Sequence, residues 1–324
     1  MNILKNINYF FSPKNLLGIF VSGLCIYWSF RNFDSDIFIN QIKSINIYLF
    51  VFAALLLILT VFIRSFRWLL FFNSEESKKL KLFDLFKNQM IGYFGNNIFP
   101  LRLGDLLRVS KMSRATSMLP SYLLGTIVAE RIIDILSLLL LLLLAFPFIW
   151  NHELIVDTFS NLQYIDLNNF YFYIFILLFL SLIIYFLFKN NKFIDWNSFI
   201  LAFANIRGCK KIVKIIILSS LIWIIYLLNI IIISNSMTGI SSFTILDSFL
   251  LLVFITFSIV VLPSVPGSIG TFQAAVIFIM TSSLFNYDKS TALSFSIVLH
   301  SYSYITYSFI GGYFFLRSNV ELNK

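Results

Sequence analysis

The chain has 324 residues, of which 59% are hydrophobic and 12% are charged, and its mean hydropathy is +0.88. A soluble protein carries about 25% charged residues. The composition therefore excludes a soluble globular enzyme and a disordered tail, and it predicts an all-α polytopic membrane protein. The net charge of +9 would suggest nucleic acid as a partner in a soluble protein. In a membrane protein it is expected to set the orientation instead, so no nucleic-acid partner is predicted.

The apolar segments predict about eight membrane-spanning helices, since one span needs about 20 apolar residues. The first segment follows Lys5 and Lys14 as the core of a signal peptide would, but no small-residue cleavage site follows it, so a retained span is expected. The predicted spans are residues 15–30, 45–63, 132–150, 170–188, 213–235, 246–262, 268–283 and 291–316.

Two further apolar segments, 85–99 and 119–130, are too short or too polar to cross a bilayer alone. We expect them to be half-helices that dip into the membrane and return, which is allowed only where protein or water satisfies the backbone. The predicted interior segments contain 21 Lys and Arg residues, and the exterior segments contain three, Arg31, Lys43 and Lys289. This asymmetry predicts that both termini are cytoplasmic. No large segment outside the membrane is predicted, so the chain is expected to form a single integral membrane domain.

Polar residues concentrate in two segments, Asn96 to Arg108 and Pro263 to Gln273. Aligning Pro100 with Pro266 gives a shared pattern of Pro-x-x-(Leu/Ile)-Gly-(Asp/Thr)-(Leu/Phe). Matching Gly and Pro interruptions in two halves are typical of a repeat-built transporter with a site near the bilayer midplane. The sequence therefore predicts two repeats, at about 1–165 and 166–324.

These two segments have the chemistry of a phosphate site. Proline ends the upstream helix, and glycine lets the backbone turn tightly. Asp105 and Thr271 are expected at the N-cap positions of the helices that follow. A helix start directed into the membrane presents free N–H groups and a positive dipole end, which attract phosphate. The alternative is that both segments are packing kinks.

A third cluster, Glu130 to Asp134, lies at the start of a Leu-rich span, and its two acids share one helical face. Ionisable groups at that depth are costly and usually face partners inside the bundle. Arg102 or Arg108 are the expected partners, and the alternative is a purely structural ion pair. At the end of the second span, three residues are interpreted as interfacial anchors. These anchors are Arg64, Arg67 and Trp68.

Together, the three clusters resemble the flippase-like membrane domain found at the front of bacterial lysylphosphatidylglycerol synthases and also as stand-alone proteins. The family's segments are Asn-x-x-x-Pro-x-Arg-x-Gly-Glu-x-x-Arg, Ala-Glu-Arg-x-x-Asp and Pro-x-Pro-Gly-Gly-x-Gly-x-x-Glu. Here they read Asn96 to Arg108, Ala129 to Asp134 and Pro263 to Gln273. Three positions depart from the pattern: Asp105 stands where Glu is usual, Ser268 replaces a Gly, and Gln273 replaces a Glu that could titrate.

The resemblance implies a multi-pass protein of the bacterial cytoplasmic membrane that moves a phospholipid or a polyprenyl-phosphate-linked lipid between leaflets. It implies no cofactor. Membrane lipids are the expected partners, with a separate lipid-modifying enzyme or a second copy of the chain as further candidates. Because the aminoacyl-transferase domain of the synthases is absent, synthesis of lysylphosphatidylglycerol itself is not expected. The predicted headgroup-binding residues are Asn96, Asn97, Pro100, Arg102, Gly104, Asp105, Arg108, Glu130, Arg131, Asp134, Pro266, Gly267, Gly270, Thr271 and Gln273.

Two other functions remain open at this point. The first is a membrane glycosyltransferase, or its accessory subunit, acting on a polyprenyl-linked lipid. In that case Asp34 and Asp36, predicted to face outside after the first span, would hold a divalent metal. The second is a scaffold without transport, in which the polar clusters would tolerate alanine. No nucleotide-binding loop of the Gly-x-x-x-x-Gly-Lys-Ser/Thr type is present, so ATP is not expected to drive the protein.

Overall fold

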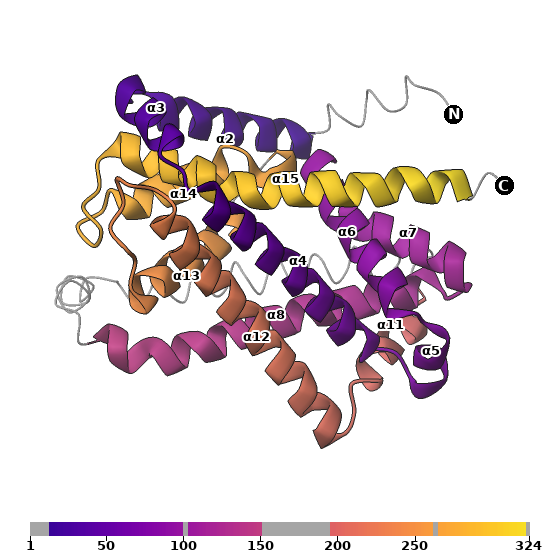
Figure 1. Ribbon diagram of the computed structural model, residues 1–324. Coiled ribbons are helices and arrows are strands. Elements are labelled where there is room, and N and C mark those ends of the chain that lie inside the picture. The colour runs from indigo at the N-terminus through magenta and orange to yellow at the C-terminus, as the bar shows by residue number, and fades with distance from the viewer. Residues whose placement is uncertain (1–12, 100–102, 151–194, 262–264, 322–324) are drawn as a thin grey trace.

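The computed structural model describes residues 13–99, 103–150, 195–261 and 265–321 of the chain. Every regular element in these ranges is a helix, which confirms the predicted all-α class (Figure 1). The elements are α2 (Pro13–Phe30), α3 (Ser35–Lys43), α4 (Ile47–Leu69), α5 (Ser74–Lys79), α6 (Leu82–Ile98), α7 (Gly104–Thr116), α8 (Pro120–Trp150), α11 (Trp196–Ala204), α12 (Cys209–Asn235), α13 (Ile245–Val261), the 3₁₀ turn η3 (Pro266–Ser268), α14 (Thr271–Met280) and α15 (Lys289–Glu321).

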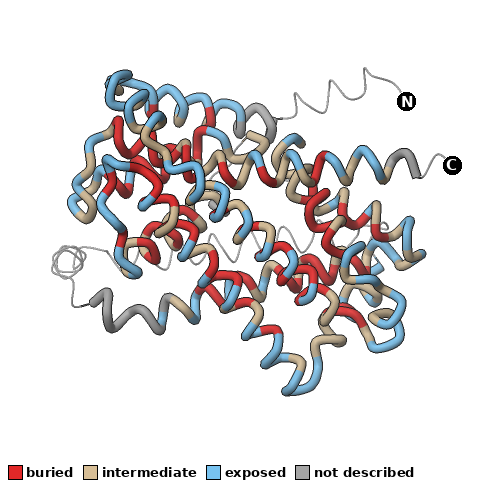
Figure 2. The backbone as a smooth tube through the Cα atoms, in the orientation of Figure 1, coloured by how far each residue is buried: buried red, intermediate tan, exposed pale blue. Residues whose placement is uncertain are grey.

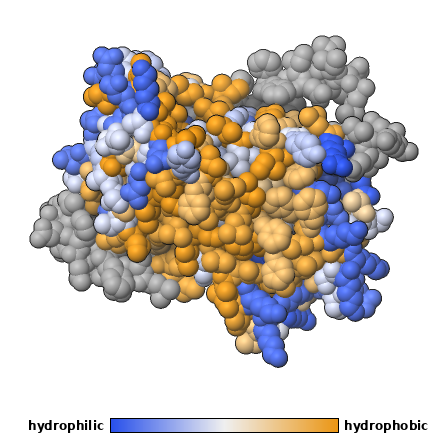
Figure 3. Space-filling model, in the orientation of Figure 1, coloured by the Kyte–Doolittle hydropathy of each residue, from blue (hydrophilic) through white to orange (hydrophobic). Residues whose placement is uncertain are grey.

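Two helices of the described chain are long and apolar enough to cross a membrane, α4 and α12. Shorter apolar helices cover Ile19–Phe30, Ile245–Ile259 and Pro266–Met280. The outward faces carry large apolar side chains such as Leu55, which is 57% exposed, and Phe309, which is 80% exposed. Figure 3 shows an apolar belt between two hydrophilic ends on the visible face of the molecule. A belt of this kind is stable when lipid tails cover it, and it agrees with a membrane location.

The buried residues lie along the middle of the bundle (Figure 2). Helix α15 packs lengthwise against α6 and α14, and α4 packs against α12 and α6. A large apolar cluster joins α12, α13, α14 and α15, and includes Leu251, Val276 and Phe295. A second, smaller cluster lies near the α5 and α11 end and contains Trp68, Leu85 and Leu123. Between the two clusters, several charged side chains are fully buried.

The predicted half-helix at 119–130 is not a separate element. Residues 120–150 form one continuous helix, α8. Pro120 stands at the first helical position, where its missing N–H costs nothing. Glu130 does not interrupt the helix because arginines of other helices neutralise it. The segment 85–99 is indeed a short helix, α6, but its hairpin partner is α7.

The predicted N-caps are displaced by one or two positions. Leu103 is the N-cap of α7, so Asp105 is its second helical residue. Gly270 is the N-cap of α14, so Thr271 is its first helical residue. A glycine stands at each helix start, as the first helical residue of α7 (Gly104) and as the N-cap of α14 (Gly270), because the chain passes close to a neighbour there. The predicted span at 170–188 lies outside the described residues.

Candidate functional site

A buried ion network forms where α4, α7 and α8 meet. Glu130 of α8 has no exposed surface, and its Oε2 lies 3.2 Å from Nη2 of Arg108 on α7. Its Oε1 lies 3.4 Å from Nη1 of Arg64 and 3.6 Å from Nη2 of Arg67, both on α4. Three guanidinium groups therefore surround one carboxylate. Such an arrangement offsets the high cost of removing each charge from water.

Asp134 adds a second carboxylate one turn along α8. Its Oδ1 lies 2.7 Å from Nη1 of Arg67, and its Oδ2 lies 2.9 Å from Nη1 of Arg64. Residues 64 and 67 are themselves about one turn apart on α4, so two one-turn pairs face each other across the helix interface. This matching spacing explains how the side chains of two helices meet without a break in either one.

The network has a partly exposed edge formed by Arg131 and Asp105. Nη2 of Arg131 lies 3.1 Å from Oδ1 of Asp105, and Nη1 lies 3.7 Å from Oδ2 of Asp134. Arg108 reaches the same Asp105 carboxylate at 3.4 Å. The Arg131 side chain is 40% exposed and that of Asp105 is 24% exposed, whereas the inner residues are nearly inaccessible. A ligand would therefore meet the network first at this edge.

Aromatic residues hold the inner arginines in place. The Arg108 guanidinium lies 4.4 Å from the ring centre of Trp68, and Nε of Arg64 donates to the hydroxyl of Tyr226 at 3.3 Å. Nε1 of Trp68 in turn donates to Thr126 on α8 at 2.9 Å. Trp68 thus joins α4, α7 and α8, and these cation–π and hydrogen-bond contacts fix the guanidinium planes.

The network has more positive than negative groups. Within the described residues it contains four arginines and three carboxylates. The surplus persists among the deeply buried members, where three arginines face Glu130 and Asp134. Nε of Arg67 and Nε of Arg108 are buried and make no hydrogen bond in the described structure. A surplus of guanidinium groups over carboxylates next to an exposed edge favours an anion over a cation.

The two interrupted segments lie against each other. Nδ2 of Asn97, at the end of α6, donates to the Tyr304 carbonyl at 3.2 Å and to Ser308 Oγ at 3.0 Å on α15. Gly267 of η3 has a φ of +68° and packs between the Tyr304 ring and the Asn97 carbonyl. Only a residue without a side chain fits both conditions. The helix breaks predicted from the sequence therefore meet at α15.

The first break is closed by a contact between α6 and α7. Oδ1 of Asn96 accepts a hydrogen bond from the Gly104 N–H at 2.9 Å. A Cβ at Gly104 would collide with the carbonyl oxygen of Gly92. The start of α7 is therefore used in holding the hairpin together, with Asn96 satisfying one of its free N–H groups.

At the second break, Gln273 caps its own helix. Its Oε1 accepts from the Gly270 N–H at 2.8 Å, so its amide Nε2 is the donor to Nδ1 of His300 at 2.9 Å. The His300 ring stacks on Phe272 with centres 4.5 Å apart. Thr271 Oγ1 donates to the Ser268 carbonyl at 3.1 Å. Because Gln273 is neutral, it holds this break by hydrogen bonds alone.

Helix α6 connects the two polar regions. Gln89 Nε2 lies 3.5 Å from Glu130 Oε2, and Asn97 lies eight residues further along the same helix. Eight residues of α-helix span about 12 Å. Helix α6 therefore carries contacts to both the ion network and the helix breaks, about 12 Å apart along its axis.

The predicted site residues thus fall into two groups. The structure brings Asp105, Arg108, Glu130, Arg131 and Asp134 together in the network. It brings Asn97 and Gly267 together at the breaks, with Pro266 in η3. Pro100 and Arg102 lie outside the described residues.

Arg64, Arg67 and Trp68 were predicted to be interfacial anchors, and that interpretation is wrong. All three are buried, and the two arginines contact Glu130 and Asp134. The sequence did contain a signal for this arrangement. Two arginines about one turn apart inside an apolar helix need acids at a matching spacing, and Glu130 and Asp134, at the junction of the predicted half-helix 119–130 and the span 132–150, offer that spacing.

Asp34 has a local structural role. Its side chain accepts hydrogen bonds from the N–H groups of Asp36 at 2.8 Å and Ile37 at 3.1 Å, so it caps the short helix α3. Capping by aspartate satisfies the first free N–H groups of a helix. Helix capping thus explains the position of Asp34, one of the two acidic residues that suggested a metal site.

The comparison with protein families agrees with these observations. Residues 15–311 match the model of the family described as "Lysylphosphatidylglycerol synthase TM region". No curated protein and no solved structure matches the chain. The match covers nearly the whole chain and includes the ion network and both helix breaks. The chain therefore belongs to the family of lysylphosphatidylglycerol synthase TM regions.

Proposed function

We propose that the protein is a lipid translocase that moves a phospholipid, or a polyprenyl-phosphate-linked lipid, between the leaflets of the membrane. The observation that carries the proposal is the net-positive ion network inside the bundle, with Arg131 and Asp105 at its exposed edge. A lipid tail can cross the bilayer in hydrocarbon, but its charged headgroup needs a polar path. The network and the adjoining helix breaks supply such a path.

Exchange of ion-pair partners would carry the headgroup. A lipid phosphate would replace Asp105 at Arg131, because guanidinium groups bind phosphate with two parallel hydrogen bonds. If the headgroup carries a cationic group, that group would instead replace Arg131 as the partner of Asp105. In both cases one charged contact replaces another, so the buried charges never lose their partners. No covalent bond has to form or break in this scheme.

The helix breaks would provide the movement. Short helices that end within the bundle can shift as units, and breaks of this kind line the central sites of many transporters. The contact of Asn97 with Tyr304 and Ser308 links the α6 break to α15. Rocking of α6 and α7 against α15 would therefore change access to the network. A lipid gradient or an ion would supply the driving force.

Under this proposal the protein lies in the bacterial cytoplasmic membrane with both termini in the cytoplasm. The arrangement of the described helices supports the predicted division of the chain into segments on two sides of the membrane. The ends of α5, α7, α11 and α15 lie at one end of the bundle, and α3 with the loops before α13 and α15 lies at the other (Figure 1). These are the same two groups of segments that the charge asymmetry assigns to opposite sides.

Lipid inversion in proteoliposomes tests the function. We expect vesicles that contain the wild-type protein to expose a labelled phospholipid to an external quencher faster than empty vesicles. Arg102→Ala should slow the exchange at least tenfold, because it removes a phosphate ligand predicted next to the first break. A wild-type rate equal to that of empty vesicles, or of the variant, would contradict the proposal.

A further inference from the structure

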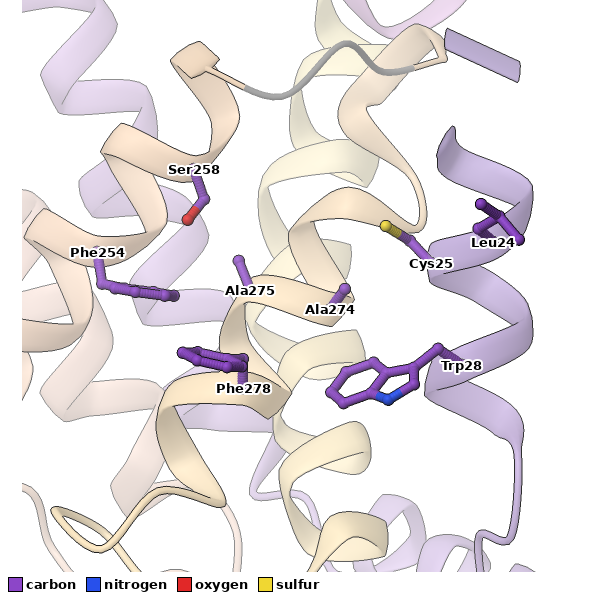
Figure 4. Close-up of a pocket in the computed structure, with 8 residues that line it drawn as sticks. All are labelled: Leu24, Cys25, Trp28, Phe254, Ser258, Ala274, Ala275 and Phe278. Carbon is purple, nitrogen blue, oxygen red and sulfur yellow. The ribbon is translucent and has the colours of Figure 1, made fainter. Parts of the chain in front are cut away.

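An apolar groove lies between α2, α13 and α14, away from the ion network. It has a volume of about 390 Å³ and is open along one side. Figure 4 shows Trp28 and Leu24 from α2, Phe254 from α13, and Ala274 and Phe278 from α14 around it. Phe254 and Phe278 stack with centres 5.7 Å apart and form one wall. Water finds few hydrogen-bond partners in a groove with this apolar lining, so a hydrocarbon chain is its expected occupant.

The depth of the groove can be derived from its helices. The lining residues of α2 and of α14 lie two to six residues before the last residues, Phe30 and Met280. At 1.5 Å per residue, this places them about 3–9 Å from the helix ends. The hydrocarbon layer of one leaflet is about 15 Å thick. On α13, Phe254 and Ser258 lie further from the helix start at Ile245, about 14–20 Å along the axis. The groove therefore begins in the leaflet that the charge asymmetry assigns to the exterior and reaches toward the bilayer midplane.

Two basic residues lie at the end of α2 beside this groove. Nζ of Lys289 lies 4.8 Å from the ring centre of Trp28, which lines the groove, and donates to the Arg31 carbonyl at 2.7 Å. Arg31 itself is exposed. These are two of the three basic residues on the predicted exterior side. The third, Lys43, ends α3 and is not part of the groove.

The nearby acids are engaged in helix capping. Asp288 accepts from the Thr291 N–H at 2.9 Å at the start of α15, and Asp34 caps α3. The ion pairs of the described structure use neither acid. Hydrogen bonds of this kind do not neutralise a carboxylate, but none of Asp34, Asp36 and Asp288 forms an ion pair with Arg31 or Lys289 in the described structure. Among the described residues, the groove therefore has two cations without an acidic partner beside an apolar slot. That combination matches an anionic headgroup with its hydrocarbon chain.

We propose that this groove binds one acyl chain of an anionic phospholipid, with the lipid phosphate held by Arg31 and Lys289. With the predicted topology the bound lipid belongs to the outer leaflet. The site is separate from the ion network, and its existence does not depend on lipid translocation. Trp28 connects its two parts, since one indole contacts both the Lys289 ammonium and the groove.

Native mass spectrometry of the purified full chain, with phosphatidylglycerol or phosphatidylcholine added, tests the site. Ala274→Phe fills the groove. Arg31→Gln removes an exposed charge and leaves the lining of the groove unchanged. We expect Ala274→Phe to abolish tight binding of phosphatidylglycerol. Arg31→Gln should weaken binding about fivefold, which is the contribution of one basic residue near a membrane surface. Phosphatidylcholine should bind more weakly than phosphatidylglycerol and should not respond to Arg31→Gln.

Two matched variants serve as controls. Leu55→Phe adds an aromatic ring to a lipid-facing position outside the groove, and Lys43→Gln removes the third exterior charge. Both should bind phosphatidylglycerol like the wild type. A photoactivatable acyl chain should cross-link to peptides of α2 and α14. Equal binding of both lipids, an unchanged Ala274→Phe, or a chain dimer that dissociates on Ala274→Phe without bound lipid would overturn the proposal.

Discussion

At the scale of single residues, the Glu130 carboxylate determines the arrangement of the network. It is completely buried and lies within 3.6 Å of three arginines from two helices. Removing one partner of a buried pair is far more harmful than replacing both, because the remaining charges stay buried without compensation. In this network three guanidinium groups would lose a shared partner at once.

Glu130→Gln should therefore destabilise the protein by about 3–5 kcal/mol. Thermal unfolding of the detergent-solubilised protein measures the effect. The matched control is Asp84→Asn, which removes an exposed carboxylate that lies 3.0 Å from Lys87. This exposed pair is worth at most about 1 kcal/mol, so the control should unfold close to the wild-type temperature. Equal unfolding temperatures for the two variants would refute the importance of the network.

At the scale of elements, the close contact between α6 and α7 explains the shape of the first helix break. A side chain at Gly104 would collide with the backbone of Gly92, so the two helices touch through their glycines. The Asn96 side chain then bonds to the Gly104 N–H. The hairpin depends on this close contact between the two helices because α6 and α7 are too short to pack through an extended apolar interface.

Gly104→Ala should separate the hairpin and cost about 1–3 kcal/mol, the usual penalty for overpacking. Gly23→Ala is the internal comparison. Gly23 also lies in a helix, but nothing stands within 4 Å of an added Cβ. That change should leave stability unchanged or raise it by about 0.5–1 kcal/mol. If Gly104→Ala proved as harmless in the thermal unfolding assay, the close contact would not exist.

The sequence predicted much of this arrangement, for identifiable reasons. Helices α2, α4, α12, α13 and α15 follow from continuous apolar segments, and the breaks follow from Pro and Gly. The partners of Glu130 were predicted only in part. Arg108 was expected and is present, but Arg64 and Arg67 were assigned to the interface. Pairing between residues that are 66 positions apart is not visible in local periodicity.

The continuity of α8 could not be predicted for the same reason. Glu130 breaks the apolar pattern of the segment 119–130, and hydropathy alone therefore indicates an interruption. In the fold the arginines of α4 and α7 neutralise the acid, and the helix continues through it. The positions of Asp105 and Thr271 differ from expectation because each helix starts one or two residues earlier than predicted, with Leu103 and Gly270 as the N-caps.

At the scale of the whole molecule, the charge asymmetry of the sequence and the arrangement of the helices divide the chain into the same two groups of segments. Basic residues gather in the predicted cytoplasmic segments, and those segments that the structure describes share one end of the bundle (Figure 1). The apolar belt lies between the ends (Figure 3). This agreement gives a testable orientation for the protein in its membrane.

Single cysteines in a chain with Cys25 and Cys209 replaced by serine should report that orientation. Asn286→Cys lies before α15 and should react with an impermeant maleimide on intact cells. Glu75→Cys lies in α5 and should react only after the membrane is opened. Labelling in the reverse pattern would show an inverted protein, and labelling of both positions on intact cells would contradict a single orientation.

The central claim is that headgroup charge passes through the network at Arg131. The most direct measurement is the rate at which purified protein inverts labelled phosphatidylglycerol in proteoliposomes, compared for the wild type, Arg131→Gln and Arg114→Gln. Arg114 is an exposed arginine at the end of α7 and serves as the control. We predict a loss of at least tenfold for Arg131→Gln and an unchanged rate for Arg114→Gln. An unchanged rate for a folded Arg131→Gln variant would contradict the account.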